Sequence, residues 1–296
     1  MESVETLEAA ITESQCEVIF NLAGLYAWWA PDNGSFRRAN VDSVRNLLAA
    51  ITNVQSDPAP RSLPKLIHVS TVLAYGRTSG GLTPETAFTE ASPAGPCSSA
   101  YAASKAEGDR LALAAFQARE VSGCILYLAC CLGADHKLVD PRRDVMRIAE
   151  LISGSVPATI TSDTIFTYVH VRDAAEAITR AAELRGNDGE RYLVGDQRLR
   201  TQEYYVLLAE VSGTPAPRFE VPGWAALGWA RLSSFVATST PPVAPADLVR
   251  TAVAGTLLFD AAKSKTELRM SYTPVRQAIE EAVALIRAER AQQGKL

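Results

Sequence analysis

The sequence predicts an α/β fold built on a parallel sheet, and two observations carry this prediction. Segments of helical and of strand character alternate over the first 135 of the 296 residues, which is the pattern of a parallel sheet with right-handed crossover connections. The candidate strands are apolar almost throughout, as strands buried on both faces are. Composition agrees, because 47% hydrophobic and 21% charged residues suffice for one large core or a core with a smaller lobe.

The first half of the chain supplies the alternating elements. Residues 2–14 predict a helix, because their apolar side chains fall on one helix face. The elements that follow are a strand at 16–24, a helix at 35–51, a strand at 65–70, a helix at 99–118 and a strand at 123–133.

After about residue 135 the pattern loosens, and proline-rich stretches at 213–223 and 238–248 favour a smaller lobe packed on the end of the sheet. The elements expected here are helices at 143–154, 201–213 and 273–293, a strand running into a helix at 164–184, and a last strand at 191–195.

Composition also excludes several classes of protein. A net charge of -4 and the lack of any basic run argue against nucleic-acid binding. The five cysteines have neither CxxC nor metal-ligand spacing, and the three histidines are scattered, so we expect reduced thiols and no zinc site. The acidic start MESVETLEAA does not read as a signal peptide. We therefore expect a cytoplasmic protein.

The most hydrophobic late stretch is VPGWAALGWARLSSFVA, residues 221–237. It is short and contains Arg231, so we interpret it as a buried helix or lid and keep a membrane-surface segment as the alternative. Trp224 and Trp229 in this stretch are expected to pack in a core, and contact with an apolar ligand is the second reading.

Tyr101 and Lys105 are four residues apart in the helix expected at 99–118, so both project from one helix face. An ammonium near a phenol favours the phenolate and lowers the tyrosine pKa towards a range useful for acid–base chemistry. This spacing is a weak signal by itself, because a helix with one aromatic and one solvated lysine side chain shows it too.

The strand KLIHVS ends at two hydroxyl residues, Ser70 and Thr71, and a turn at 75–76 follows. Ligands of open α/β sheets bind outside the carboxyl ends of strands. A hydroxyl at that edge, with the phenol and the ammonium, forms a set suited to protonating a carbonyl oxygen as hydride arrives. Local turn chemistry is the alternative role for both hydroxyls.

Several ordered motifs resemble those of the extended short-chain dehydrogenase/reductases, also called the NAD-dependent epimerase/dehydratase family. They look nearest to its branch of dihydroflavonol reductases and 3β-hydroxysteroid dehydrogenases. The resembling segments are VIFNLAG, NVDSVRNLL, HVSTVLAYG, TEASPAGPCSSAYAASKAEGD, YVHVRDAAEAI and FDAAKSKTEL. The resemblance implies a Rossmann-like parallel sheet with flanking helices, which would occupy residues 1–135, and a region at 136–296 with late Rossmann elements and a small substrate lobe.

The resemblance also implies roles for single residues. Tyr101 would be the general acid and base, and Thr71 would orient the substrate oxygen. Lys105 would bind the nicotinamide ribose of NADP or NAD and lower the pKa of Tyr101.

Four further residues follow from the same resemblance. Asn21, Ala23 and Gly24 would lie along the cofactor at the end of their strand. Asn40 would stabilise that region or its water network, or else serve only as a helix cap or surface group.

The chain departs from the family pattern at its start, where the loop GxxGxxG and the first βαβαβ portion are missing, an estimated ~60 residues. The strand at 16–24 would then be a bare apolar edge. Three explanations stay open: a truncated sequence, a short form without cofactor binding, or a sheet completed by a partner or a symmetry mate. A second departure is Tyr127-Leu128 in place of the family's Arg-Pro, which puts the substrate class in doubt.

The function implied is NAD(P)-dependent hydride transfer to or from a carbonyl or carbinol of a small hydrophobic substrate. One alternative is a nucleotide-sugar epimerase. The other is a non-catalytic or truncated relative. An epimerase would use basic residues for the diphosphate, and the candidates are Arg198, Arg200 and Arg218. Relatives dimerise through two helices, so the resemblance implies a homodimer through residues 35–55 and 98–119; we expect no membrane span.

Overall fold

The protein forms a four-stranded parallel sheet with helices on both faces, as a computed structural model of the chain shows. The structure describes residues 1, 3–32, 34–55, 64–76, 83–140, 146–156, 158–236 and 245–292. The sheet has the order β1-β2-β3-β7, with β1 at Val18–Asn21, β2 at Lys65–Thr71, β3 at Gly123–Leu128 and β7 at Arg191–Val194. The predicted parallel α/β class is confirmed.

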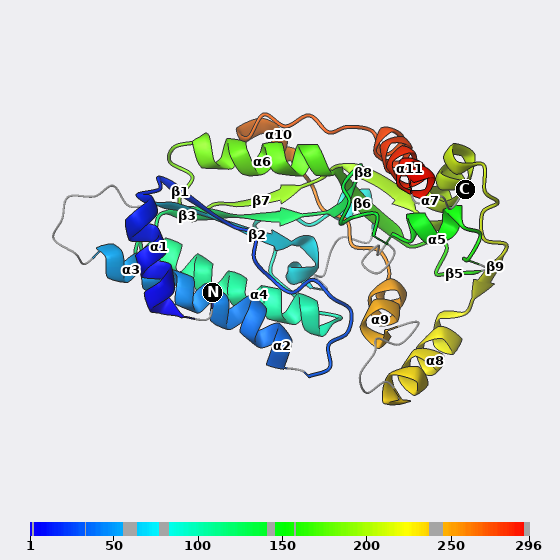
Figure 1. Cartoon of the computed structure of the whole chain (residues 1–296), viewed down its shortest axis with the longest axis horizontal. Coiled ribbons are helices and arrows are strands. Elements are labelled where there is room, and N and C mark those ends of the chain that lie inside the picture. The colour runs from blue at the N-terminus through cyan, green and yellow to red at the C-terminus, as the bar shows by residue number, and fades with distance from the viewer. Residues whose placement is uncertain are drawn as a thin grey trace.

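Helices cover the sheet in two layers (Figure 1). α3 (Ser43–Gln55) and α4 (Ala100–Gln117) lie on one face, and α6 (Val171–Glu183) lies on the other. Two strand side chains in this core, Leu66 and Ile125, are fully buried. Burying a side chain of this size contributes about 1.5–3 kcal/mol, so the two layers hold the central strands firmly.

β1 lies at one side of the sheet. Among the described residues it pairs with β2 alone, and its Phe20 is 44% exposed. α1 (Val4–Ser14), capped by the Ser3 hydroxyl, packs beside α3 near this edge.

The strand predicted at 123–133 is in fact two strands that belong to different sheets. The Ala129 amide still donates to the Val194 carbonyl (2.9 Å), after which the chain leaves the central sheet. β4 (Cys130–Leu132) then pairs with β6 (Ile165–His170), and β6 pairs antiparallel with β8 (Gln197–Arg200). The sequence does not indicate this change of sheet, because residues 123–133 form one unbroken apolar run.

A second core lies beneath the later helices, against β4 and β6. It is covered by α5 (Ile148–Ile152), α7 (Thr201–Ser212) and α11 (Val275–Gln292). The helix predicted at 143–154 is shorter than expected where the structure describes it, and residues 141–145 lie outside the described ranges. The division of the chain at residue 135 stays a prediction.

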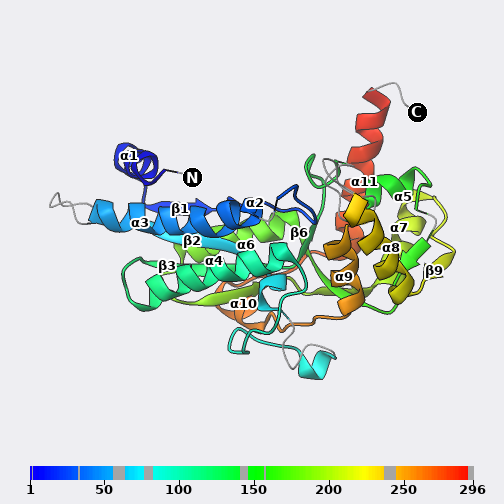
Figure 2. The same cartoon turned by 90° about the horizontal axis from the view of Figure 1, so that it is seen from below.

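The apolar stretch at 221–237 forms α8 (Gly223–Val236), which packs on α9 (Ala246–Ala254). The expectation that its tryptophans pack in a core is wrong: Trp224 is 80% exposed and Trp229 is 64% exposed. The buried face of α8 consists of small alanines that lie against α9, so the indoles face outward. Figures 1 and 2 place α8 and α9 at the end of the molecule away from α1.

Four short helices and a small sheet complete the described elements. They are α2 (Gly34–Arg37), the 3-10 turns Val72–Tyr75 and Pro84–Thr86, α10 (Ala262–Glu267), and β5 (Ala158–Ile160) paired with β9 (Phe219–Val221). In the ranges given above, no helix combines the length and the apolarity needed to cross a bilayer.

A π-helical turn, Arg38–Asp42, interrupts the expected helix at 35–51 between α2 and α3. It packs against α4 at Gly108, where an added Cβ would lie 2.3 Å from the Asn40 carbonyl oxygen. The two backbones therefore approach more closely than any side chain at 108 permits.

We predict that Gly108→Ala destabilises the protein, although alanine favours a helix more than glycine does. Overpacking against a backbone oxygen costs about 1–3 kcal/mol, and urea unfolding measures the loss. The matched control is Gly228→Ala in the middle of α8, where nothing lies within 4 Å of the added Cβ. That change should stabilise by about 0.5–1 kcal/mol. Equal effects of the two changes would contradict the close approach.

Candidate active site

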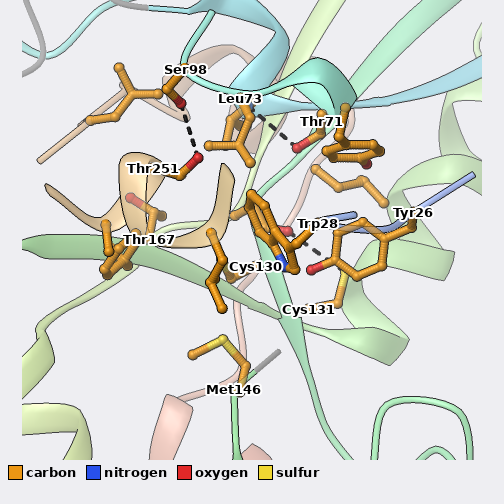
Figure 3. A pocket seen from close by; sticks show the side chains of 18 of the residues that line it. Tyr26, Trp28, Thr71, Leu73, Ser98, Cys130, Cys131, Met146, Thr167 and Thr251 are labelled. Atoms are coloured by element: carbon orange, nitrogen blue, oxygen red, sulfur yellow. Dashed lines mark hydrogen bonds between the residues drawn. The ribbon is translucent and has the colours of Figure 1, made fainter. Parts of the chain in front are cut away.

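A large pocket lies at the carboxyl ends of β1, β2 and β3, with a volume of about 500 Å³. Its walls come from the segment after β1, the end of β2, the start of α4, the β3–β4 junction, β6, α7 and α9. Figure 3 shows the labelled side chains turned towards a common space. Most of the lining is aliphatic or aromatic, and the polar groups set into it fix how a ligand can be oriented.

Thr71 ends β2 and lines the pocket. Its hydroxyl accepts a hydrogen bond from the Leu73 amide (3.3 Å) and so caps the 3-10 turn that follows (Figure 3). The expected turn role is therefore present. A capping hydroxyl uses its oxygen as acceptor, so its proton is left for an oxygen in the pocket, here that of Tyr101.

Tyr101 lies in the first turn of α4, which the Ser99 hydroxyl caps by accepting from the Ala102 amide (3.1 Å). Its ring is covered edge-on by Tyr26 and Trp28, with ring centroids 5.2 and 6.3 Å away. Only 8% of Tyr101 is exposed. Burial raises the pKa of the Tyr101 phenol well above its ordinary value, and a hydrogen bond with Thr71 opposes this shift.

Lys105 follows one turn later on the same face of α4 and is 6% exposed. Its ammonium donates to the Val69 carbonyl of β2 (2.8 Å). Burial lowers the pKa of Lys105, and the Asp109 carboxylate acts in the opposite direction. The expected lowering of the Tyr101 pKa is not found in this structure, because burial of the phenol dominates and the ammonium is bound to Val69.

Asn40 connects the segment after β1 to α4, which favours the first of its two expected roles over a surface role. It is 1% exposed, and its side-chain amide donates to the Ser104 hydroxyl (2.9 Å). Its side-chain oxygen, Oδ1, accepts a hydrogen bond from the Leu25 amide (2.8 Å). At Gly24 an added Cβ would lie 2.9 Å from this same oxygen. The backbone at Gly24 is thereby held against Asn40.

A buried polar network lies behind the pocket and joins β1, β2 and α4. Asn21 donates through its amide to Nδ1 of His68 (3.0 Å), so Nε2–H of His68 donates to Asp109 (3.0 Å). The Ser70 hydroxyl donates to the other oxygen of Asp109 (2.7 Å). All four side chains are at most 5% exposed. Burial lowers the pKa of His68, the hydrogen bond with Asp109 opposing it.

The pocket brings together most of the predicted site residues. Those that line it are Ala23, Gly24, Thr71, Tyr101 and Lys105. The Asn21 side chain does not line it and belongs to the buried network instead.

Sequence reasoning missed several residues at this site. Trp28 was not distinguished from the other aromatic residues, and His68 and Asp109 looked like isolated polar groups. A signal did exist for the last two. His68 and Ser70 are two residues apart in an apolar strand, so their side chains point to the same face of the sheet. Asp109 stands four residues after Lys105, so the two share one helix face.

The comparisons with known proteins agree on one family. The sequence profile of the NAD-dependent epimerase/dehydratase family matches residues 2–195. A protein of Synechocystis sp. (strain ATCC 27184 / PCC 6803 / Kazusa), provisionally described as a dihydroflavonol 4-reductase, is 26% identical over 275 residues, which are 90% of this chain and 75% of that protein.

Solved structures share the fold. The UDP-glucuronic acid 4-epimerase from Bacillus cereus in complex with NAD is 18% identical with a TM-score of 0.72, over 97% of this chain and 80% of that one. The dTDP-glucose 4,6-dehydratase from Bacillus anthracis, also in complex with NAD, is 20% identical with a TM-score of 0.72, over 98% and 78%.

We predict that Asp109→Ala costs about 2–4 kcal/mol of unfolding free energy. The change removes both acceptor oxygens and leaves the His68 Nε2–H and the Ser70 hydroxyl buried without their partner. Urea unfolding measures the loss.

The control is Glu107→Gln on the same helix. Glu107 forms an exposed pair with Arg37 (3.1 Å), so its loss should cost at most about 1 kcal/mol. An Asp109 variant as stable as this control would show that the buried network contributes nothing.

Proposed function

Because the chain belongs to the NAD-dependent epimerase/dehydratase family, we propose that it transfers hydride between a nicotinamide cofactor and a carbonyl or carbinol carbon of a small apolar substrate. One observation carries the proposal: the hydroxyl, phenol and ammonium of Thr71, Tyr101 and Lys105 meet in one largely apolar pocket. Hydride addition to a ketone needs a proton for the oxygen, and the buried phenol is placed to supply it.

The nicotinamide end of the cofactor fits the residues present. Lys105 uses one of its three donors at Val69, which leaves donors for ribose hydroxyls. The backbone at Gly24 lies close to Lys105, because a Cβ added at Gly24 would lie 4.0 Å from the Lys105 ammonium nitrogen. The cofactor, when bound, supplies or accepts the hydride. The described residues contain no GxxGxxG turn, so we assign no residues to the diphosphate.

The side chains then divide the remaining work. Thr71 donates a hydrogen bond to the substrate oxygen and holds it near the phenol. Tyr101 gives a proton to that oxygen in reduction and takes it back in oxidation. The phenol is therefore the group that carries the transferred proton in either direction. Lys105 holds the ribose with the donors that its bond to Val69 leaves free.

An apolar ketone or alcohol is the substrate class that the pocket fits best. Leu138, Met146, Phe166, Leu248 and Leu257 all line it. The Synechocystis relative, described as a dihydroflavonol 4-reductase, is named for a substrate of this kind. The exposed Trp224 and Trp229 do not line the pocket, so the indole that faces substrate is Trp28.

A nucleotide-sugar epimerase is the second candidate, and the one observation in its favour is a basic residue, Arg147, in the pocket wall. The arginines that an epimerase could use for a diphosphate, Arg198, Arg200 and Arg218, do not line the pocket. Arg198 donates instead to the Phe259 carbonyl. A non-catalytic relative is the third reading, and the homodimer through α3 and α4 stays a prediction.

We predict that the purified chain binds NADPH or NADH in a fluorescence titration and reduces apolar ketones. Tyr101→Phe should then lower turnover by about 10²–10⁴-fold, because it removes the proton donor, and should leave cofactor binding nearly unchanged.

The matched control is Tyr75→Phe. Tyr75 is buried beside the site but does not line the pocket, so turnover should change less than about threefold. Cofactor binding without any turnover would favour the non-catalytic relative, and equal losses in the two variants would remove Tyr101 from its assigned role.

A further inference from the structure

Two buried polar atoms in the pocket wall have no hydrogen-bond partner within the described part of the chain. They are the Thr167 hydroxyl oxygen and the Trp28 indole nitrogen. Buried polar atoms without partners are uncommon, since leaving one unsatisfied costs about 1–3 kcal/mol. When such an atom lines a pocket, a molecule bound in that pocket is positioned to supply the missing partner.

Thr167 lies in the middle of β6 and is 5% exposed. Other hydroxyls of the wall are engaged: Ser98 with Thr251 (3.0 Å), and Thr201 with the Thr164 carbonyl (3.1 Å). A valine at 167 would have the same shape and no polar atom to bury. The position therefore carries a hydroxyl that neither packing nor an internal hydrogen bond requires.

Figure 3 shows where this hydroxyl lies relative to the reactive groups. Thr167 stands on one side of the pocket and Thr71 on the opposite side, with Trp28 between them. Thr167 is thus remote from the end where the substrate oxygen meets Thr71. A molecule that fills the pocket from Thr71 to Thr167 places its far end at the Thr167 hydroxyl.

We propose that the Thr167 hydroxyl forms a second polar subsite, which recognises an oxygen atom at the far end of the substrate. This inference rests on the proposed function, which fixes the end of the pocket that reacts. The substrate class becomes narrower: an apolar, ring-bearing ketone or alcohol with a second oxygen function remote from the reacting carbon.

The hydrogen-bonding capacity of Thr167 favours a hydroxyl as that second oxygen. The Thr167 hydroxyl can donate and accept, so a substrate hydroxyl pairs with it in either direction. A substrate without the oxygen leaves the Thr167 hydroxyl buried and unpaired, and sites of this kind discriminate more strongly than apolar pockets do. The Trp28 indole belongs to the reacting end, where its ring lies against that of Tyr101.

The test compares binding of 2-tetralone with binding of its 5-, 6-, 7- and 8-hydroxy isomers to the full chain, measured by calorimetry. At least one hydroxy isomer should bind about tenfold more tightly than the parent, the value of one net hydrogen bond. Thr167→Val should bring that ratio close to one without weakening 2-tetralone itself. Thr167→Ser, which keeps the hydroxyl, should retain the preference.

Each other outcome is decisive. If no isomer is preferred, or if the preference persists in Thr167→Val, the subsite is wrong. Turnover with NADPH separates this from the proposed function. Reduction of 2-tetralone without any hydroxyl preference keeps the function and overturns the subsite. A preference that depends on Thr167, without turnover of any isomer, keeps the subsite and contradicts the function.

Discussion

The buried carboxylate of Asp109 is the group on which the rest of the site depends. A charge removed from water is tolerated only when hydrogen-bond donors surround it, and here the donors are His68 and Ser70. His68 is held in turn by Asn21. One ionised group therefore joins α4 to β2 and, through the imidazole, β2 to β1. If any of these elements slid along another, it would leave an unpaired polar group in the core.

The site follows from the match of two periodicities. Tyr101, Lys105 and Asp109 stand four residues apart and share one face of α4, while His68 and Ser70 share one face of β2. The network fixes how the helix face meets the strand face. Lys105 consequently reaches the β2 backbone, and Tyr101 reaches the carboxyl end of β2, where Thr71 lies. The pocket is the space that these fixed elements and the later lobe enclose.

The sequence was sufficient for the parallel sheet, because alternating elements and apolar strands depend on local pattern. It was also sufficient to bring Thr71, Tyr101 and Lys105 together, since strand ends and helix faces can be located by counting. It was not sufficient for the change of sheet at Ala129, which depends on the partner of each strand. The outward tryptophans of α8 and the unpaired Thr167 hydroxyl were equally out of reach, because exposure and hydrogen bonding are properties of packing between distant segments.

The most direct test of this account is the protonation state of His68, measured by nitrogen NMR on histidine-labelled protein between pH 5.5 and 8. The account predicts that the ring titrates below its ordinary value, because burial lowers the pKa of His68, and that the neutral ring carries its proton on Nε2, because the Asn21 amide occupies Nδ1. A ring that titrates near its ordinary value of about 6.5, or that carries its proton on Nδ1, would contradict the network and the geometry derived from it.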